Sequence, residues 1–239
     1  MYGYRARIGY TSPPVATEIF PYEFYKIVPE GVTLVVSTLA VTQMTADDIE
    51  ESYNLSLVLA KEHARVGVDL VVLGGIPINV MRGIDKVDDL IRDTEASIGV
   101  PVTTSLTAQI AGLHAVEAKN VGLIHPFGDF HDDKTREYLD YYKFNCSGIK
   151  GANKTIGELG RMSVEDALEI GRSFKASHPE TDTLWYIGPH WPVSAAIETL
   201  ENELGISVIG ANQAIVWQAL RRCNVNDRIQ GFGYLLREF

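Results

Sequence analysis

Predicted strands and helices alternate along this chain from end to end, and this alternation limits the possible folds more than any other feature. Short apolar runs such as VTLVVSTLAV (residues 32–41) and TLWYIGP (residues 183–189) are typical of buried strands, and longer amphipathic segments separate them. Strands that alternate with helices form βαβ units and therefore parallel sheets. With 239 residues the chain can bury one large core or two small ones. We therefore predict an α/β protein.

Local signals set the bounds of the predicted elements. Thr45 is the expected N-cap of a helix that ends near residue 66, and Ser163 is the expected N-cap of the helix 164–177, with Glu165 near the capping-box position. Pro13 and Pro14 are expected to end the first strand. The predicted strands are residues 5–11, 32–41, 68–74, 100–105, 120–126, 183–189 and 206–212. The predicted helices are residues 18–28, 45–66, 85–97, 107–118, 132–144, 164–177, 194–205 and 213–223, followed by a tail rich in glycine and aromatic residues.

The two halves of the chain repeat the same order of elements. VGVDLVVLGGIP (residues 66–77) and TDTLWYIGPHWP (residues 181–192) occupy equivalent points, and each is a buried strand that runs into a turn containing glycine. We call residues 74–77 the first glycine turn and residues 188–191 the second glycine turn. We predict two Rossmann-like subdomains related by a pseudo-twofold axis. The first comprises residues 1–118 with part of the C-terminal segment 213–239, and the second comprises residues 119–212.

Parallel sheets place their ligands at the carboxyl ends of the strands, and sites between subdomains are common. We therefore expect the active site in the cleft between the two subdomains, where both glycine turns face it.

Charge and cysteine content restrict the class of protein. The formal net charge is -10, which disfavours nucleic acid or an anionic membrane as the main partner. Cys146 and Cys223 are the only cysteines and have no metal-ligand spacing, so no disulfide framework or cysteine metal site is expected. No apolar run approaches the ~18 residues that span a bilayer, and the N-terminus lacks a signal peptide. We expect a cytoplasmic protein, and a homo-oligomer is compatible with the sequence.

Five segments, taken in order, resemble a known family. They are IGYTSPP (residues 8–14), VVLGGIPINVMRG (71–83), VPVTTSLTAQIAGL (100–113), VGLIHPF with the following REYL (121–127 and 136–139) and ISVIGANQAIVWQAL (206–220). With this order and spacing the chain resembles the aspartate/glutamate racemase superfamily, in its arylmalonate decarboxylase and maleate isomerase branch. The resemblance implies two α/β subdomains and an enzyme that needs no metal or organic cofactor. It also implies decarboxylation or isomerisation of a small carboxylate through an enolate-like intermediate.

The chain departs from this family where the family's chemistry is located. The resemblance places the two family cysteines at Gly75 and Gly188, although arylmalonate decarboxylases carry glycine at the first position. Hydroxyl residues of the family become Ile76 and Pro77, and a family tyrosine becomes Phe127. Thiol-based racemisation is therefore impossible at these positions, and the hydroxyl, phenol and backbone N–H donors that steady a developing anion are reduced in number.

Histidines in the expected cleft loops are the candidates to replace the thiols. His190 lies two residues after Gly188, and His125 ends the predicted strand 120–126; imidazole titrates near neutral pH and can carry a proton. His131 and Asp129 follow in the same loop and could join His125 as metal ligands, but the spacing matches no metal motif, so we predict no metal. The expected substrate-binding residues are Thr11, Ser12, Pro14, Gly75, Ile76, Asn79, Phe127, Asn153, Gly188, Pro189 and Trp191.

Three functions remain open at this point. The first is a cofactor-independent lyase or isomerase, resembling a decarboxylase, that uses His190 or His125 to move a proton. The aromatic residues near the loops favour an aromatic or bulky carboxylate as its substrate. The second is a hydrolase or hydratase on the same scaffold, in which a histidine activates water. The third is a binder of small molecules that has lost its chemistry.

Overall fold

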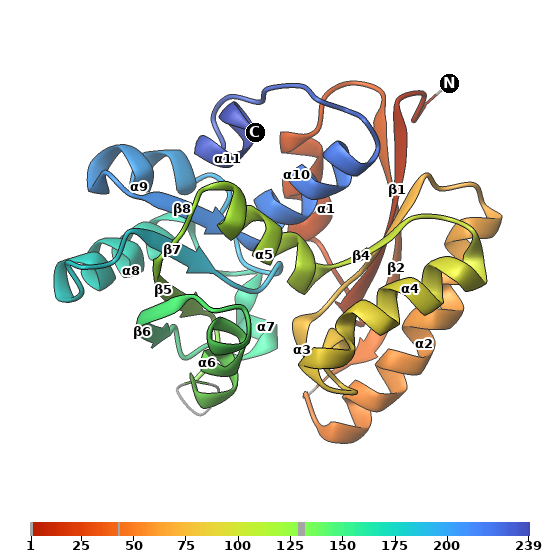
Figure 1. Cartoon of the computed structure of the whole chain (residues 1–239), viewed down its shortest axis with the longest axis horizontal. Helices are drawn as coiled ribbons and strands as arrows, with labels where there is room; N and C mark the ends of the chain where they lie inside the picture. Colours follow the sequence, from red (N-terminus) through yellow and green to blue (C-terminus); the bar gives the residue numbers. More distant parts are fainter. Residues whose placement is uncertain (1, 43, 129–131) are drawn as a thin grey trace. The chain divides into compact units, whose positions relative to one another are not determined.

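The computed structural model describes residues 2–42, 44–128 and 132–239, and the chain divides into two units. Unit 1 comprises residues 1–108 and 218–227, and unit 2 comprises residues 109–217 and 228–239. Each unit is built on a four-stranded parallel sheet with flanking helices (Figure 1). The predicted α/β class with parallel sheets is therefore confirmed. The division between the units falls within the helices α5 (Ser105–Ala115) and α10 (Ala211–Arg222).

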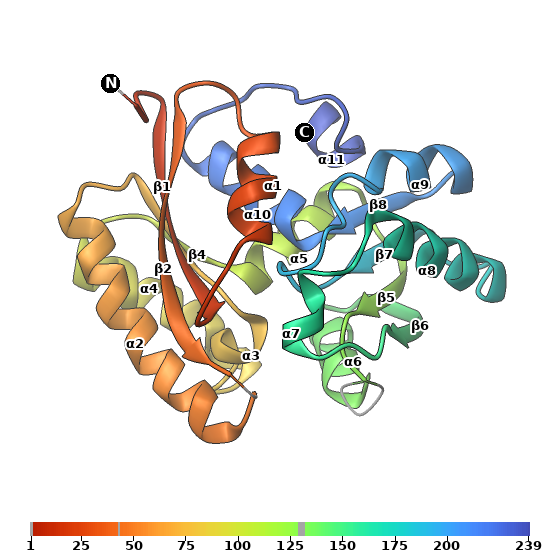
Figure 2. The same ribbon diagram turned by 180° about the vertical axis from the view of Figure 1, so that it is seen from behind.

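The sheet of unit 1 has the strand order β2-β1-β3-β4. Its strands are β1 (Ala6–Pro14), β2 (Val32–Val41), β3 (Leu70–Leu73) and β4 (Val102–Thr104). Its helices are α1 (Ile19–Ile27), α2 (Ala46–Arg65), α3 (Ile76–Asn79) and α4 (Val87–Ile98), with a 3-10 turn at Ile84–Lys86. Figures 1 and 2 show α2 and α4 together on one face of this sheet and α1 on the other.

The side chains of unit 1 follow the two faces of its sheet. Val71 and Leu73 of β3 pack with residues of α2 and α4 in one buried cluster. On β1, Gly9 leaves room for His63 of α2, because a Cβ at Gly9 would lie 2.8 Å from the His63 Nδ1 atom. On the opposite face Tyr10 stacks on Phe20 of α1, with ring centroids 3.9 Å apart.

The sheet of unit 2 has the order β6-β5-β7-β8, which is the same relative order as in unit 1. Its strands are β5 (Asn120–His125), β6 (Asn145–Gly151), β7 (Thr183–Tyr186) and β8 (Ser207–Gly210). Its further helices are α6 (Asp132–Tyr141), α7 (Ile156–Leu159), α8 (Val164–Ser177), α9 (Ile197–Leu204) and α11 (Tyr234–Glu238).

Alternate residues of β7 face opposite layers in unit 2, as expected for a strand buried on both faces. Leu184 and Tyr186 join a buried cluster with residues of α8 and α9. Trp185 faces the other layer, where its Nε1 donates to Oε1 of Gln109 on α5 at 2.9 Å. The Tyr186 hydroxyl donates to the carbonyl of Ala167 on α8 at 2.8 Å.

The repeat between the two halves extends to individual hydrogen bonds. Oε1 of Glu95 on α4 accepts from the backbone N–H of Val102 at 2.7 Å. Oε1 of Glu201 on α9 accepts from the backbone N–H of Val208 at 3.1 Å. Both carboxylates reach the strand seven residues further on, across a left-handed glycine that ends each helix. Matched strand orders and matched hydrogen bonds show that the two units are built in the same way.

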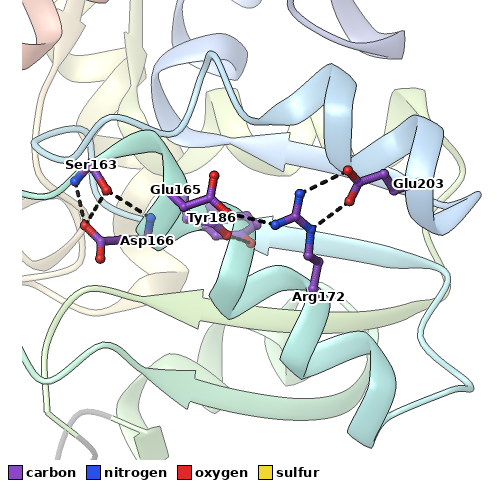
Figure 3. A network of polar contacts seen from close by, with 7 residues as sticks. Ser163, Glu165, Asp166, Arg172, Tyr186 and Glu203 are labelled. Atoms are coloured by element: carbon purple, nitrogen blue, oxygen red, sulfur yellow. Dashed lines mark hydrogen bonds and ion pairs between the residues drawn. The ribbon is translucent and has the colours of Figure 1, made fainter.

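The helix caps follow the predicted signals, with one correction. The Thr45 hydroxyl accepts from the backbone N–H of Asp48 at 3.1 Å. Ser163 begins α8, but the residue that completes its capping box is Asp166, three positions on, and not Glu165. Glu165 instead pairs with Arg172 at 2.9 Å, and Arg172 also pairs with Glu203 (Figure 3).

Further elements differ from the sequence prediction. β1 continues through both prolines to Pro14, with an irregular register against β2 after Ser12. The structure adds strand β6 and the short helices α3, α7 and α11, none of which was predicted. No helix in the described part of the chain is long and apolar enough to cross a membrane.

Candidate active site

The carboxyl ends of β1 and β3 form the candidate site of unit 1. These strands are neighbours in the sheet, with Thr11 opposite Leu73, while the chain after β1 goes to the far side to form β2. This reversal of strand order is the point at which open α/β sheets bind ligands. The first glycine turn begins here, directly after β3.

Backbone contacts leave no room for a side chain at the start of the first glycine turn. The backbone N–H of Gly74 donates to Oγ1 of Thr11 at 3.1 Å, and a Cβ at Gly74 would lie 2.1 Å from the Thr11 carbonyl oxygen. Gly75 has a φ of 85°, and a Cβ there would lie 2.7 Å from Cγ of Pro13. Thr11 therefore holds the turn against β1, and glycine is required at both positions.

Asn79 has a structural role in unit 1. Its Nδ2 donates to the Leu73 carbonyl at 3.1 Å, and its Oδ1 accepts from the Ser105 hydroxyl at 3.0 Å and the Leu106 N–H at 3.4 Å. The side chain is buried, so both ends of the amide serve the protein itself. Asn79 thus ties β3 and α3 to the start of α5, and its role in binding substrate stays a prediction. Ile76, at the start of α3, is buried as well.

Ser12 and Pro14 lie at the carboxyl end of β1. Ser12 is fully buried, and its Oγ has no hydrogen-bond partner among the described residues. Pro14 is half-buried. Orphaned hydroxyls in a protein interior are rare, because burial without a partner is unfavourable. Ser12 therefore has free hydrogen-bonding capacity beside the first glycine turn.

The second glycine turn follows β7 in unit 2 and repeats the geometry of the first. Gly188 has a φ of 96°, and a Cβ there would lie 3.2 Å from Cγ of Pro126, which follows β5. Trp191 is buried in the core of unit 2 and its Nε1 donates to the Ile187 carbonyl at 3.0 Å. The indole thus closes the turn around Gly188 and the buried Pro189.

His190 lies inside this second turn. Its Nε2 is buried and has no hydrogen-bond partner in the described part of the chain. Burial lowers the pKa of His190 to about 4, because desolvation disfavours the charged imidazolium. The free protein at neutral pH therefore holds a neutral imidazole with an unused nitrogen, which can take a proton or a hydrogen bond from a ligand.

His125 has a different environment at the end of β5. It is fully buried, and its Nε2 lies 2.8 Å from Oδ1 of Asp132 at the start of α6. The carboxylate is an acceptor, so the imidazole donates through Nε2. This pair orients the ring and ties β5 to α6.

Asn153 lies beside Phe127 through a backbone contact. Its N–H donates to the Phe127 carbonyl at 3.0 Å, and its φ of 53° is a left-handed conformation that asparagine tolerates. The Asn153 side chain is exposed, and Phe127 is half-buried against the core of unit 2. Both remain substrate-binding predictions, and β6 is the strand that brings them together.

Neither cysteine is activated. Burial raises the pKa of Cys223 to about 11 and also raises the pKa of Cys146, so both thiols stay protonated near neutral pH. Among the residues that the structure describes, no cluster of three or more His, Cys, Asp or Glu side chains could hold a metal ion. Asp129 and His131, the alternative metal ligands, lie outside the described residues.

Tyr10 is one of the aromatic residues that the sequence places near the loops of the predicted site. Its ring lies against the first glycine turn, because a Cβ at Gly74 would be 3.0 Å from two of its ring atoms. Its hydroxyl is buried and has no partner within the described ranges. The signal in the sequence is the alternation of β1, which puts Tyr10 on the same face as Ser12.

Known proteins with this sequence pattern share the fold along the whole chain. The protein-family model described as arylmalonate decarboxylase matches residues 8–236. Arylmalonate decarboxylase of Bordetella bronchiseptica is 24% identical over 238 residues, covering 97% of this chain and 96% of the relative. Maleate isomerase of Nocardia farcinica is 30% identical over 141 residues, covering 57% of this chain and 55% of the relative.

Solved structures show the same likeness at the level of the fold. A liganded double mutant of arylmalonate decarboxylase has a TM-score of 0.90 at 20% identity, covering 98% of this chain and 100% of the other. Maleate isomerase from Pseudomonas putida S16 has a TM-score of 0.87 at 19% identity, covering 98% of each chain. These relatives are enzymes, a lyase and isomerases. Because the family model spans nearly the whole sequence, the chain belongs to the arylmalonate decarboxylase family.

Proposed function

We propose that this chain is a cofactor-independent lyase or isomerase that acts on a small carboxylate and moves a proton through His190. The observation that carries the proposal is Nε2 of His190 in the second glycine turn, which is buried and has no hydrogen-bond partner among the residues that the structure describes. Family membership supports the reaction class, since the relatives are named as a decarboxylase and as isomerases. The apolar side chain of Phe127 supports an aromatic or bulky carboxylate as substrate.

The environment of His190 suits either direction of proton transfer. In the free protein the imidazole is neutral, because burial lowers its pKa to about 4, so it can accept a proton from an α-carbon. A bound carboxylate beside it raises the pKa again, because an opposite charge favours the imidazolium. When a dianionic substrate binds, the ring can therefore take up a proton and act as an acid.

In a decarboxylation by this route, solvent supplies the one proton that replaces the lost carboxyl group. The bond between the α-carbon and one carboxyl group breaks, carbon dioxide leaves, and the electron pair stays on the α-carbon and the remaining carboxylate. The proton on His190 moves to the α-carbon, and water returns a proton to the ring. Isomerisation uses the same group to remove and return a proton without loss of carbon dioxide.

The test is proton NMR of the protein in deuterium oxide with arylmalonates, maleate, 2-hydroxy acids, 2-amino acids and small lactones. We expect loss of a carboxyl group or deuterium incorporation at an α-carbon, and loss of this turnover in His190→Ala. His114→Ala is the matched control, because His114 is an exposed residue of α5 that lies against Phe144. Full activity of His190→Ala overturns the histidine assignment, and ligand binding without any turnover favours a non-catalytic binder.

The His125–Asp132 pair favours one alternative, a hydrolase or hydratase. A carboxylate 2.8 Å from an imidazole orients the ring, as it does in sites where histidine activates water. Reaction in water labelled with oxygen-18 separates the two functions. Hydrolysis or hydration is supported if the product of a lactone or of maleate carries the label and His125→Ala no longer forms it. The lyase or isomerase is supported if the products are unlabelled and His190→Ala no longer forms them.

A further inference from the structure

Two buried hydroxyls on β1, beside the first glycine turn, have no hydrogen-bond partner in the described part of the chain. Tyr10 and Ser12 are separated by one residue, so both side chains project from the same face of the strand. Both residues are fully buried, and neither hydroxyl has a hydrogen-bond partner among the residues described. A buried hydroxyl without a partner is unfavourable, and a ligand that accepts hydrogen bonds would satisfy it.

The position of the Tyr10 ring is fixed by its neighbours. It stacks on Phe20 with a centroid distance of 3.9 Å and an angle of 21° between the rings. On its other side it lies against Gly74, where a Cβ would be 3.0 Å from the Cζ and Cε2 atoms. The hydroxyl is attached to Cζ and therefore lies near the first glycine turn, at the carboxyl ends of β1 and β3.

Both groups are donors at neutral pH. Burial raises the pKa of Tyr10, because the phenolate would be poorly solvated, so the phenol keeps its proton. A serine hydroxyl also donates and rotates freely to suit an acceptor. Two O–H groups that project from one face of a strand suit an anionic oxygen acceptor.

We propose that the hydroxyls of Tyr10 and Ser12 bind a carboxylate of the substrate and donate hydrogen bonds to it as negative charge develops there. This inference rests on the proposed function. Ile76, Pro77 and Phe127 supply no side-chain donor, and Pro77 also lacks a backbone N–H, so the chain needs other donors for an enolate-like intermediate. Tyr10 and Ser12 provide two from a different strand.

Tyr186 offers a matched control for Tyr10. Tyr186, drawn in Figure 3, is also fully buried in a strand. Its hydroxyl, however, donates to the Ala167 carbonyl at 2.8 Å. Tyr186→Phe therefore removes a satisfied hydrogen bond, while Tyr10→Phe removes an orphaned hydroxyl. We expect Tyr186→Phe to lower the Tm of the ligand-free protein and Tyr10→Phe to leave it unchanged or raise it.

The kinetic test uses the carboxylate that the wild-type protein turns over. We expect Tyr10→Phe and Ser12→Ala each to lower kcat/KM by about a hundredfold, as loss of one oxyanion donor does. Tyr186→Phe should leave kcat/KM unchanged. Values within about threefold of wild type for both Tyr10→Phe and Ser12→Ala overturn the inference. A fall in the ligand-free Tm of Tyr10→Phe that matches Tyr186→Phe shows a structural hydrogen bond and also overturns it.

The outcomes separate this inference from the proposed function. If turnover is lost in His190→Ala but kept in Tyr10→Phe, the proposed function stands and only the role inferred for the two hydroxyls is overturned. If no carboxylate is turned over, the probe is phenylmalonate and the measurement is its stabilisation of the folded protein. Stabilisation lost in Tyr10→Phe and kept in Tyr186→Phe supports the carboxylate site without catalysis; equal stabilisation in both, or none in the wild type, overturns it.

Discussion

The histidines His125 and His190 differ in the hydrogen bonding of Nε2. The His125 ring is fixed by Asp132, whereas Nε2 of His190 is buried without a partner in the described chain. The sequence places both residues in the loops expected to line the site and favours His190. We propose His190 for proton transfer, because its buried Nε2 has no partner in the described chain that a substrate would have to displace.

His190 predicts a pH dependence of stability. Its pKa falls from an ordinary 6.5 to about 4 on folding, so the unfolded chain binds more protons between these pH values. Stability contributed by the neutral ring is complete above pH 6.5 and is lost as the pH falls through 4. The difference corresponds to roughly 3 kcal/mol. Urea unfolding at about pH 7 and about pH 4 should show wild type losing this much more stability than His190→Gln.

The variant His190→Gln is the appropriate reference, since glutamine is polar but does not titrate in this range. Buried His63, whose pKa burial also lowers, contributes equally to both proteins. Parallel pH profiles for wild type and variant would show that the imidazole of His190 is solvated, contrary to the structure.

The raised pKa values of the two cysteines predict that they resist alkylation in the folded protein. Burial raises the pKa of Cys223 to about 11 and raises that of Cys146, so few thiolates exist near neutral pH. We expect iodoacetamide under native conditions to leave turnover intact, and denatured protein to alkylate at both residues by mass spectrometry. Rapid loss of activity that tracks modification of either cysteine would contradict a histidine mechanism.

At the scale of elements, the two glycine turns show most directly how the sequence determines the backbone conformation. Each turn follows a central strand, has a glycine with positive φ, and packs against a proline from the neighbouring strand, Pro13 or Pro126. The contact is tighter in the first turn, because a Cβ would lie 2.7 Å from the proline Cγ at Gly75 and 3.2 Å at Gly188. A side chain is therefore more easily accepted in the second turn.

This difference predicts an order of stability for alanine substitutions. Gly188→Ala should cost about 1–3 kcal/mol from backbone strain, and Gly75→Ala should cost about 1–3 kcal/mol more from overpacking against Pro13. Gly99→Ala is the control for positive φ alone, because a Cβ there meets nothing within 4 Å. Urea unfolding measures the three costs. A Gly75→Ala protein as stable as Gly99→Ala would show that Pro13 yields without cost.

The repeated carboxylate hydrogen bonds predict equivalent roles for Glu95 and Glu201. Replacement of either by alanine leaves a backbone N–H of the next strand without its acceptor, at a cost of about 1–3 kcal/mol. Glu201 also accepts from the Tyr234 N–H at 2.7 Å, so its loss should release α11 as well. In hydrogen exchange we expect faster exchange at Val208 and Tyr234 in Glu201→Ala. Unchanged protection at both amides would refute this role of Glu201.

At the scale of the whole molecule, the alternation of strands and helices was enough to predict the α/β class and parallel sheets. It failed at β6, whose sequence NCSGIKG is polar and rich in glycine, because an edge strand need not be apolar on both faces. The helices α3, α7 and α11 have four or five residues, too few for a helical period to show. β1 includes Pro14 because a strand end does not need every backbone N–H.

The sequence predicts where the candidate site residues lie in the fold, but it does not predict their hydrogen-bond partners. Ser12 lies near the end of β1 and His190 follows β7, which locates both at the carboxyl ends of strands. The Asn79 amide forms hydrogen bonds inside unit 1, and the Tyr10 hydroxyl has no partner among the described residues. Both facts depend on neighbours that are distant in the sequence. Periodicity and capping signals describe local structure and carry no information about such pairings.

Transfer of a proton by His190 to or from a carboxylate substrate is the step on which the proposed function depends. Proton NMR in deuterium oxide of wild type, His190→Ala and His114→Ala with the carboxylate panel measures this step. We predict carboxyl loss or α-deuteration in wild type and His114→Ala, and a fall of at least about a hundredfold in His190→Ala. Equal rates in all three proteins would contradict the assignment of His190.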